Sequence, residues 1–316
     1  MIVALSLSLL IVSAILTRQL VSYPHRFSKM DIPNERSSHI TPTPRGGGIA
    51  FVATSLIGFL LLLLNDGLNR TELLALCCAG SIVAIAGHLD DRQKISGATV
   101  RLFLHAISAV ILIVGVGIPS ELALFDQTVN TGIVGSILGV VYLVWLLNLF
   151  NFMDGTDGIA ASEAIFVVLA GAFLSYHVLS DANHSAAAIT LAASTFGFIL
   201  YNWSPAKIFM GDVGSGFLGI VIGGLSLIAA NQDRELLWVW IILLAAFVSD
   251  ATVTLIRRLL RKKSRTSRTA VTHISILRSG SIHMQRSRYS FLLSTSRGYC
   301  QLRFLLPISK LLELPE

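Results

Sequence analysis

The sequence predicts an all-α, polytopic membrane protein, and three observations support this fold class. Hydrophobic residues make up 53% of the 316-residue chain, and the mean hydropathy is +0.72. Charged residues make up only 13%, whereas soluble domains carry roughly 25%. Apolar stretches of about 20 residues, the length needed to cross about 30 Å of hydrocarbon, recur along the chain.

Nine of these stretches are expected to be transmembrane helices. They cover approximately residues 2–22, 47–64, 72–88, 99–117, 131–149, 159–179, 185–201, 214–230 and 236–256. The first lacks a basic leading segment and an obvious small-residue cleavage site, so we interpret it as a span rather than a signal peptide. The three cysteines provide neither a disulfide framework nor a spaced metal site.

The net charge of +6 is unevenly distributed along the chain. Residues 1–261 carry 14 basic and 16 acidic side chains, whereas residues 262–316 carry 10 and 2. The basic excess therefore belongs to the tail, and it does not indicate nucleic-acid binding. If the N-terminus lies outside, most loop Lys and Arg residues lie inside, which predicts that the acidic motifs described below face the cytoplasm.

The first inside loop, residues 31–48, contains three prolines and ends in three glycines, Gly46 to Gly48. This composition predicts an ordered, irregular loop whose backbone can approach a ligand or a neighbouring helix. His39 and Arg45 are the cationic candidates for binding a phosphate there. A solvated connector is the alternative interpretation.

Polar residues also end two of the predicted spans on the same side. Asp90 and Asp91 end the third, whereas Asn151, Asp154 and Asp157 follow the fifth. The Asp-x-x-Asp spacing brings two carboxylates to one side, and such polar density next to an apolar span is costly unless it has a function. For the adjacent pair alone, a solvated turn is the alternative.

A glycine-rich turn follows the seventh span and contains Lys207 and Asp212. Glycines 211, 214 and 216 surround the acid just before the next span, which suits a metal or phosphate at a helix N-terminus. Carboxylates without a Cys or His cluster favour Mg²⁺ or Mn²⁺ over zinc. A plain glycine-rich turn between helices is the alternative.

Asp250 differs from the other acids because it lies within the ninth span. An acid at that depth is expected to face the bundle interior, where it binds substrate or pairs with Arg257, about two turns away. Asp250 is the acid that best fits a rival function, an ion-coupled secondary transporter, whose acids lie near the membrane midplane. The remaining acids gather at one interface, which favours an enzyme.

Five segments, in this order, resemble motifs of the polyprenyl-phosphate N-acetylhexosamine-1-phosphate transferases, which belong to bacterial glycosyltransferase family 4. They read NERSSHITPTPRGGG, GHLDDR, NFMDGTDGIA, PAKIFMGDVGSGFLG and DATVTLIRR. The resemblance runs from about residue 20 to 262, and it is greatest to members that initiate O-antigen or similar surface glycans.

The resemblance implies a Mg²⁺-dependent transfer of sugar-1-phosphate from a UDP-N-acetylhexosamine to undecaprenyl phosphate, with release of UMP. It places the active site at the cytoplasmic face of the bacterial inner membrane and the product in lipopolysaccharide O-antigen or related synthesis. By motif, Asp90 and Asp91 would activate the lipid phosphate, and Asp212 would bind the metal. Further catalytic and substrate-binding candidates are Asp154, Asp157, His39, Arg45, Asn151, Lys207 and Asp250.

The tail departs from this family, so we divide the chain into a membrane transferase domain, residues 1–261, and an aberrant basic tail, residues 262–316. Family members continue with an Ala-His-Arg-Ser-His-Ala-Tyr-Gln motif and a last, tenth membrane helix. Residues 268–275 here read RTAVTHIS, and their codons, read one nucleotide earlier, are compatible with all eight residues of that motif.

We therefore hypothesise a frameshift near residues 262–263 that removes the tenth helix and two histidines expected to contact the nucleotide-sugar phosphates. The product as written would then be an inactive or weakly active remnant of the transferase. The alternatives are a divergent basic tail and a membrane-surface segment attracted to anionic lipid.

Overall fold

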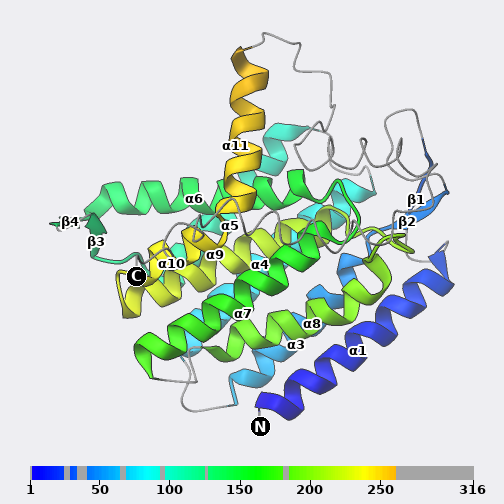
Figure 1. The fold of residues 1–316 in the computed structure, drawn as a ribbon, viewed down its shortest axis with the longest axis horizontal. Helices are drawn as coiled ribbons and strands as arrows, with labels where there is room; N and C mark the ends of the chain where they lie inside the picture. Colours follow the sequence, from blue (N-terminus) through cyan, green and yellow to red (C-terminus); the bar gives the residue numbers. More distant parts are fainter. Residues whose placement is uncertain are drawn as a thin grey trace, which may run out of the picture. The chain divides into compact units, whose positions relative to one another are not determined.

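The computed structural model describes residues 2–24, 29–33, 41–64, 69–92, 97–124, 127–180 and 185–260. These residues form a helical bundle with two short antiparallel hairpins (Figure 1). The helices are α1 (Ile2–Ser22), α3 (Gly48–Leu62), α4 (Arg70–Asp91), α5 (Ala98–Val116), α6 (Gly132–Met153), α7 (Ile159–Leu179), α8 (Ala186–Asn202), α9 (Asp212–Gln232), α10 (Leu236–Leu243) and α11 (Ala245–Leu260). The hairpins pair β1 (Lys29–Asp31) with β2 (Thr43–Arg45) and β3 (Glu121–Leu124) with β4 (Gln127–Asn130).

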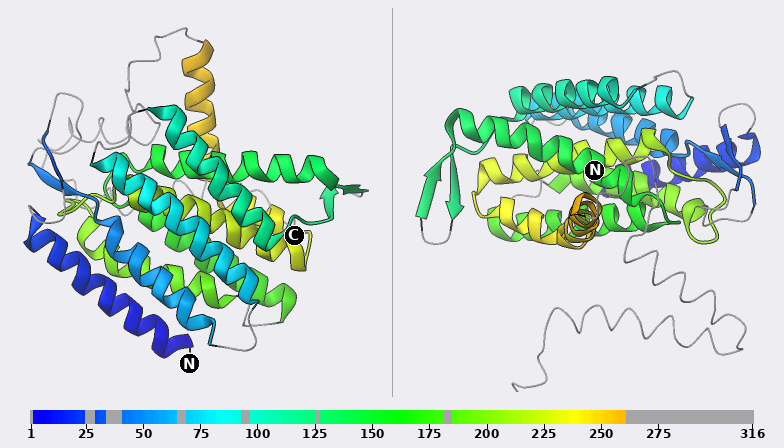
Figure 2. Two further views of the ribbon diagram at one scale, coloured as in Figure 1. Left: turned by 180° about the vertical axis from the view of Figure 1, so that it is seen from behind. Right: turned by 90° about the horizontal axis from the view of Figure 1, so that it is seen from above.

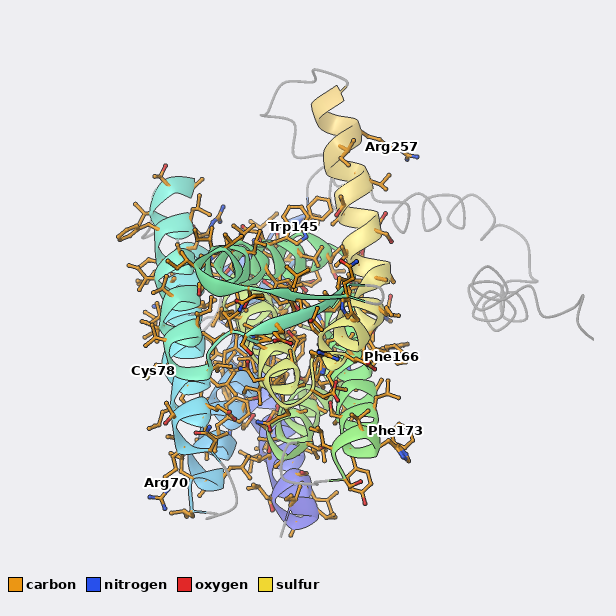
Figure 3. All side chains as sticks on the ribbon, turned by 90° about the vertical axis from the view of Figure 1, so that its left-hand side faces the viewer. Arg70, Cys78, Trp145, Phe166, Phe173 and Arg257 are labelled. Carbon is orange, nitrogen blue, oxygen red and sulfur yellow. The ribbon has the colours of Figure 1, made fainter. Side chains whose placement is uncertain are left out.

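The helices confirm the predicted polytopic membrane fold. Among the described residues, six helices (α1, α4, α5, α6, α7 and α9) are long and apolar enough to cross a bilayer, and α3 and α8 are shorter apolar helices. The predicted ninth span is present as α10 and α11, which together pass the same test but are bent by 60°. Large apolar side chains cover the outer surface, as Phe166 and Phe173 do where they project from α7 (Figure 3).

Helix α9 forms the centre of the bundle. Every residue from 213 to 230 is buried, and the helix contacts α3, α4, α5, α6 and α7. Glycines permit this close packing, since a Cβ atom on Gly219 would lie 2.7 Å from the carbonyl oxygen of Leu146 on α6. Small residues allow backbones to approach in membrane proteins, where water-driven burial between helices is absent. Helix α9 is therefore closely packed among its neighbours along most of its length.

The two hairpins lie at opposite ends of the bundle, a separation that is visible from both sides (Figures 1 and 2). The β1–β2 end contains the last residue of α4, the first residue of α9 and the turn after α6. The described part of the loop before α3 is thus at the same end as the acidic motifs. His39 and the whole tail from residue 261 onward lie outside the described residues.

Backbone hydrogen bonds attach the loop before α3 to the loop before α9. The Phe209 N–H donates to the Pro44 carbonyl at 2.9 Å, and the Gly47 N–H donates to the Phe209 carbonyl at 2.9 Å. The Gly48 N–H donates to the Met210 carbonyl, also at 2.9 Å. Two loops that lie far apart in the sequence are therefore fixed to each other, which positions Arg45 beside the start of α9.

Candidate active site

Arg45 joins two of the predicted acids into one ion-pair network. Its Nη2 atom lies 2.6 Å from Asp212 Oδ1, and its Nε atom lies 3.0 Å from Asp91 Oδ1. The two carboxylate side chains are only 13% and 8% exposed, whereas the Arg45 side chain is 42% exposed. Burial disfavours the charged guanidinium, but the carboxylates of Asp212 and Asp91 outweigh it and raise the Arg45 pKa.

Arg101, in the first turn of α5, provides the second guanidinium of the network. Its Nη1 atom lies 2.6 Å from Asp90 Oδ2 and 3.5 Å from Asp212 Oδ2. Both oxygens of the Asp212 carboxylate therefore face an arginine, one from each side. Arg45, Arg101, Asp90, Asp91 and Asp212 are called the arginine–carboxylate network below.

Asp91 is also hydrogen-bonded to the first turn of α9. Its Oδ1 atom accepts from the Asp212 N–H at 3.2 Å, and its Oδ2 atom accepts from the Val213 N–H at 3.3 Å. The N-cap residue of α9, Gly211, has a φ of +77° and no side chain that could cap the helix. Free N–H groups in a first helical turn need an acceptor, and Asp91 supplies it from α4.

The two acids that follow α6 face different partners. Asp154 interacts with Arg45 and with the Gly211 backbone N–H, beside the network. Burial raises the pKa of Asp154 well above its usual value, and the carboxylates of Asp212 and Asp91 raise it further. Asp157 Oδ2 instead accepts from the Ala206 N–H at 3.2 Å. The turn thus places one carboxylate at the network and uses the other to hold the loop before α9.

The remaining predicted site residues are distributed around this end. Asn151 Nδ2 donates to Ser215 Oγ at 3.3 Å and also interacts with the Asp212 carboxylate. Lys207 has an exposed side chain on the loop before α9. Asp250 is half-buried on α11, a helix that packs against α6 and α10, and its predicted substrate contact stays a prediction.

The chemistry of the network suits a divalent cation, although no preformed cation site is present in the described chain. The three carboxylates of the network, from Asp90, Asp91 and Asp212, outnumber its two guanidiniums, and the carboxyl group of Asp154 lies beside them. Hard oxygen donors of this kind are the ligands that Mg²⁺ and Mn²⁺ prefer. No group of three acidic, His or Cys side chains among the described residues has the geometry to hold a metal.

Sequence reasoning missed Arg101 and Asn202. Arg101 lies inside an apolar stretch, but only 11 residues separate it from Asp90, across one short inside loop. This short separation could have indicated an ion pair between the two side chains. Asn202 is 2% exposed; its Oδ1 accepts from the Gly158 N–H at 3.1 Å, and its Nδ2 donates to the Ile208 carbonyl at 2.9 Å. This buried amide joins the turn after α6 to the loop before α9, and no local pattern distinguishes it from a helix-ending Asn.

Comparison with known protein families identifies the family of the chain. A family model described as glycosyl transferase family 4 matches residues 73–230, half of the chain. The chain belongs to glycosyl transferase family 4. This family assignment confirms the resemblance inferred from the five motifs, and the matched region extends from α4 to α9, the two helices whose ends carry Asp90, Asp91 and Asp212.

Several curated proteins are similar to the chain. A probable undecaprenyl-phosphate N-acetylglucosaminyl 1-phosphate transferase of Bacillus subtilis is 32% identical over 81% of this chain and 70% of its own length. A decaprenyl-phosphate N-acetylglucosaminephosphotransferase of Mycolicibacterium smegmatis is 31% identical over 66% of this chain and 55% of its own length. A phospho-N-acetylmuramoyl-pentapeptide-transferase of Frankia alni is 30% identical over 64% of this chain. The chain thus spans little more than half of the mycobacterial relative, and all three relatives are named as transferases.

Proposed function

We propose that this protein transfers an N-acetylhexosamine-1-phosphate from a UDP-sugar to undecaprenyl phosphate and releases UMP. The single observation that carries the proposal is the arginine–carboxylate network, which gathers charges from four separate segments at one end of a membrane bundle. The names of the similar transferases support the class of reaction. The product would begin a lipid-linked surface polysaccharide such as O-antigen, made at the cytoplasmic face of the bacterial inner membrane.

The charges of the two substrates explain why such a network is needed. Both the lipid phosphate and the sugar-nucleotide diphosphate are anionic, so they repel each other unless cations lie between them. The Arg45 side chain contacts two largely buried acids and is still 42% exposed, so it is positioned and remains partly accessible to a phosphate. Arg101, with 29% of its side chain exposed, offers a second positive charge beside Asp90.

A divalent cation, Mg²⁺ or Mn²⁺, is proposed as the cofactor. Asp212 and Asp90 would hold it, with Asp154 beside them, and when bound it would neutralise the diphosphate charge that develops during transfer. Asn151 and Asp157 would orient the nucleotide end, and His39, Lys207 and Asp250 are the further substrate-binding candidates. The acceptor phosphate, with a second pKa near 6, is largely ionised at neutral pH, so the protein's main task is to orient it for in-line attack.

The positions of the acids disfavour the rival carrier function. Asp91 is the last residue of α4, Asp212 is the first residue of α9, and Asp154 directly follows α6. Ion-coupled carriers instead hold their ions near the midplane, commonly between broken helices. The network therefore lies at the ends of apolar helices, and the proposal is that a water-soluble sugar nucleotide meets a lipid phosphate there.

Incorporation of radioactive sugar from a UDP-N-acetylhexosamine into organic-extractable lipid tests the proposal. We expect incorporation by membranes that contain the protein, loss of incorporation with a chelator and recovery with Mg²⁺ or Mn²⁺. Parallel assays with UDP-GlcNAc and UDP-GalNAc identify the donor. Sugar or ion uptake into vesicles without lipid labelling would contradict the transferase and favour the carrier.

We also propose that the sequence from about residue 262 is the product of a frameshift. The compatibility of the codons for residues 268–275 with the family's His-containing motif supports this proposal. Resequencing codons 255–280 and comparing the 316-residue form with a frame-restored form in the lipid-labelling assay tests it. We expect the restored form to be far more active, and equal turnover by the two forms would contradict the proposal.

A further inference from the structure

We infer that Asp91 is a positioning residue, which fixes the start of α9 and thereby orients the carboxylate of Asp212, and that Asp90 is the member of the pair left open to a ligand. This inference rests on the proposed transferase function for its catalytic meaning. The resemblance to the family treats the adjacent acids as one functional unit, but their contacts are not alike.

The hydrogen bonds of Asp91 use both of its oxygens on the backbone of α9. Oδ1 accepts from Asp212 N–H and Oδ2 accepts from Val213 N–H, at 3.2 and 3.3 Å. The next two N–H groups of the helix, from Gly214 and Ser215, bond to the Gly211 carbonyl within the same turn. Asp91 thus satisfies the two N–H groups that the local chain leaves without an acceptor, and its charge also favours a helix N-terminus.

The space around Asp91 leaves no room for a ligand between its carboxylate and α9. A Cβ atom on Gly211 would lie 2.7 Å from Asp91 Oδ2, and a Cβ atom on Gly87 of α4 would collide with the Asp212 backbone. The ends of α4 and α9 therefore touch through backbone atoms. With 8% of its side chain exposed and Arg45 Nε at 3.0 Å, the Asp91 carboxylate is largely enclosed by its neighbours.

Asp90 has the opposite surroundings although it is the adjacent residue. Its Oδ2 atom lies 2.6 Å from Arg101 Nη1, and 23% of its side chain is exposed. Arg101 Nη1 is shared with Asp212 Oδ2 at 3.5 Å, so Asp90 and Asp212 face a common position from two helices. The carboxylate that can meet a cation together with Asp212 is therefore that of Asp90.

Substitution of each acid provides a matched test, because the two residues are adjacent and each substitution removes the same carboxylate charge. Hydrogen–deuterium exchange on the full chain in detergent reports the amides of residues 212 and 213. We expect about tenfold faster exchange in Asp91→Ala, the effect of losing a helix cap, and wild-type exchange in Asp90→Ala. The amides of residues 214 and 215 serve as the internal reference. Unchanged exchange in Asp91→Ala would overturn the inference.

Turnover in the lipid-labelling assay gives the second readout. Asn retains one acceptor oxygen, so we expect Asp91→Asn to keep activity within about tenfold of wild type and Asp91→Ala to lose about 100-fold in kcat, as a misplaced catalytic group does. Asp90→Asn should be inactive. Equal inactivity of Asp91→Asn and Asp90→Asn, with both proteins folded, would overturn the inference. If wild type shows no transfer, the proposed function fails, and the exchange experiment still decides whether Asp91 holds α9.

Discussion

The two ends of the bundle both carry ion pairs, but the pairs are held in different ways. At the network end, Arg45 joins two carboxylates that are 8% and 13% exposed. At the β3–β4 end, Arg234 Nη1 lies 3.5 Å from Glu121 Oε2, and the two side chains are 48% and 50% exposed. An exposed ion pair contributes little to folding stability because water and salt screen it. A buried charge without a partner is strongly destabilising, so buried charges are normally paired.

This difference shows which property of a charge cluster indicates function. A long-range ion pair alone does not, because both ends of the bundle have one. The network is distinguished by shared partners, since Asp212 meets two arginines and Arg45 meets two acids. It also has more carboxylates than guanidiniums, whereas the pair at the far end is balanced. An unbalanced buried cluster is suited to a further cation, and substitutions at the two ends should therefore have very different effects.

Asp212→Asn should produce the largest effect. It removes the carboxylate that contacts both guanidiniums and that is proposed to hold the cation, so we expect lipid labelling to fall on the order of 1000-fold. Glu121→Gln, which neutralises one acid at the other end, is the matched control and should label lipid normally. If Asp212→Asn labelled lipid within a few-fold of wild type, the prediction that charges at the network end matter more than those at the β3–β4 end would be wrong.

Replacement of each arginine by lysine sharpens the comparison within the network. Arg45 contacts two acids through two different nitrogens, Nε and Nη2, whereas Arg101 contacts two acids through Nη1 alone. A lysine ammonium can reproduce a single-point contact but not a planar two-nitrogen contact. We expect turnover to fall about 100-fold in Arg45→Lys and by about tenfold or less in Arg101→Lys. The reverse order would show that the contacts of Arg45 are not needed for the reaction.

Gly48→Ala tests how tightly the network end is packed. A Cβ atom on Gly48 would lie 2.5 Å from Gly214 Cα, so the starts of α3 and α9 would have to separate. We expect a loss of about 1–3 kcal/mol in the free energy of unfolding, measured by thermal unfolding in detergent. Gly155→Ala is the control, because its nearest neighbour would be the Phe152 carbonyl oxygen at 3.9 Å. Equal stability of the two variants would mean that the loop before α3 is not held against α9.

The fold was largely predictable from the sequence because the length of an apolar stretch is a local property. All nine predicted segments are helical, and the network acids Asp90, Asp91 and Asp212 lie at helix ends, whereas Asp250 lies within α11. The 60° bend between α10 and α11 was not predictable, because residues 236–254 contain neither Pro nor Gly, the usual causes of a kink.

The site was predictable as a set of residues but not as a set of contacts. Asp90, Asp91 and Asp212 were identified because acids beside a membrane span are costly. Their partners follow from tertiary packing: Arg45 meets Asp212 across 167 residues, and Arg101 was hidden in an apolar stretch. The separate contacts of Asp90 and Asp91 depend on where α9 begins relative to α4, which a single sequence does not specify.

Arg234→Gln should have the smallest effect and tests the other side of the comparison. Its pairing with Glu121 is long and solvent-exposed, so we expect the free energy of unfolding to change by less than about 0.5 kcal/mol. Lipid labelling should be unchanged, and raising the salt concentration should remove even the small stability difference, because salt screens exposed charges. The measurement is thermal unfolding of wild type, Arg234→Gln and Arg234→Gln/Glu121→Gln at low and high salt. A loss of turnover in Arg234→Gln without unfolding would show that charge at the far end also serves the reaction, and burial would then no longer separate the functional charges from the others.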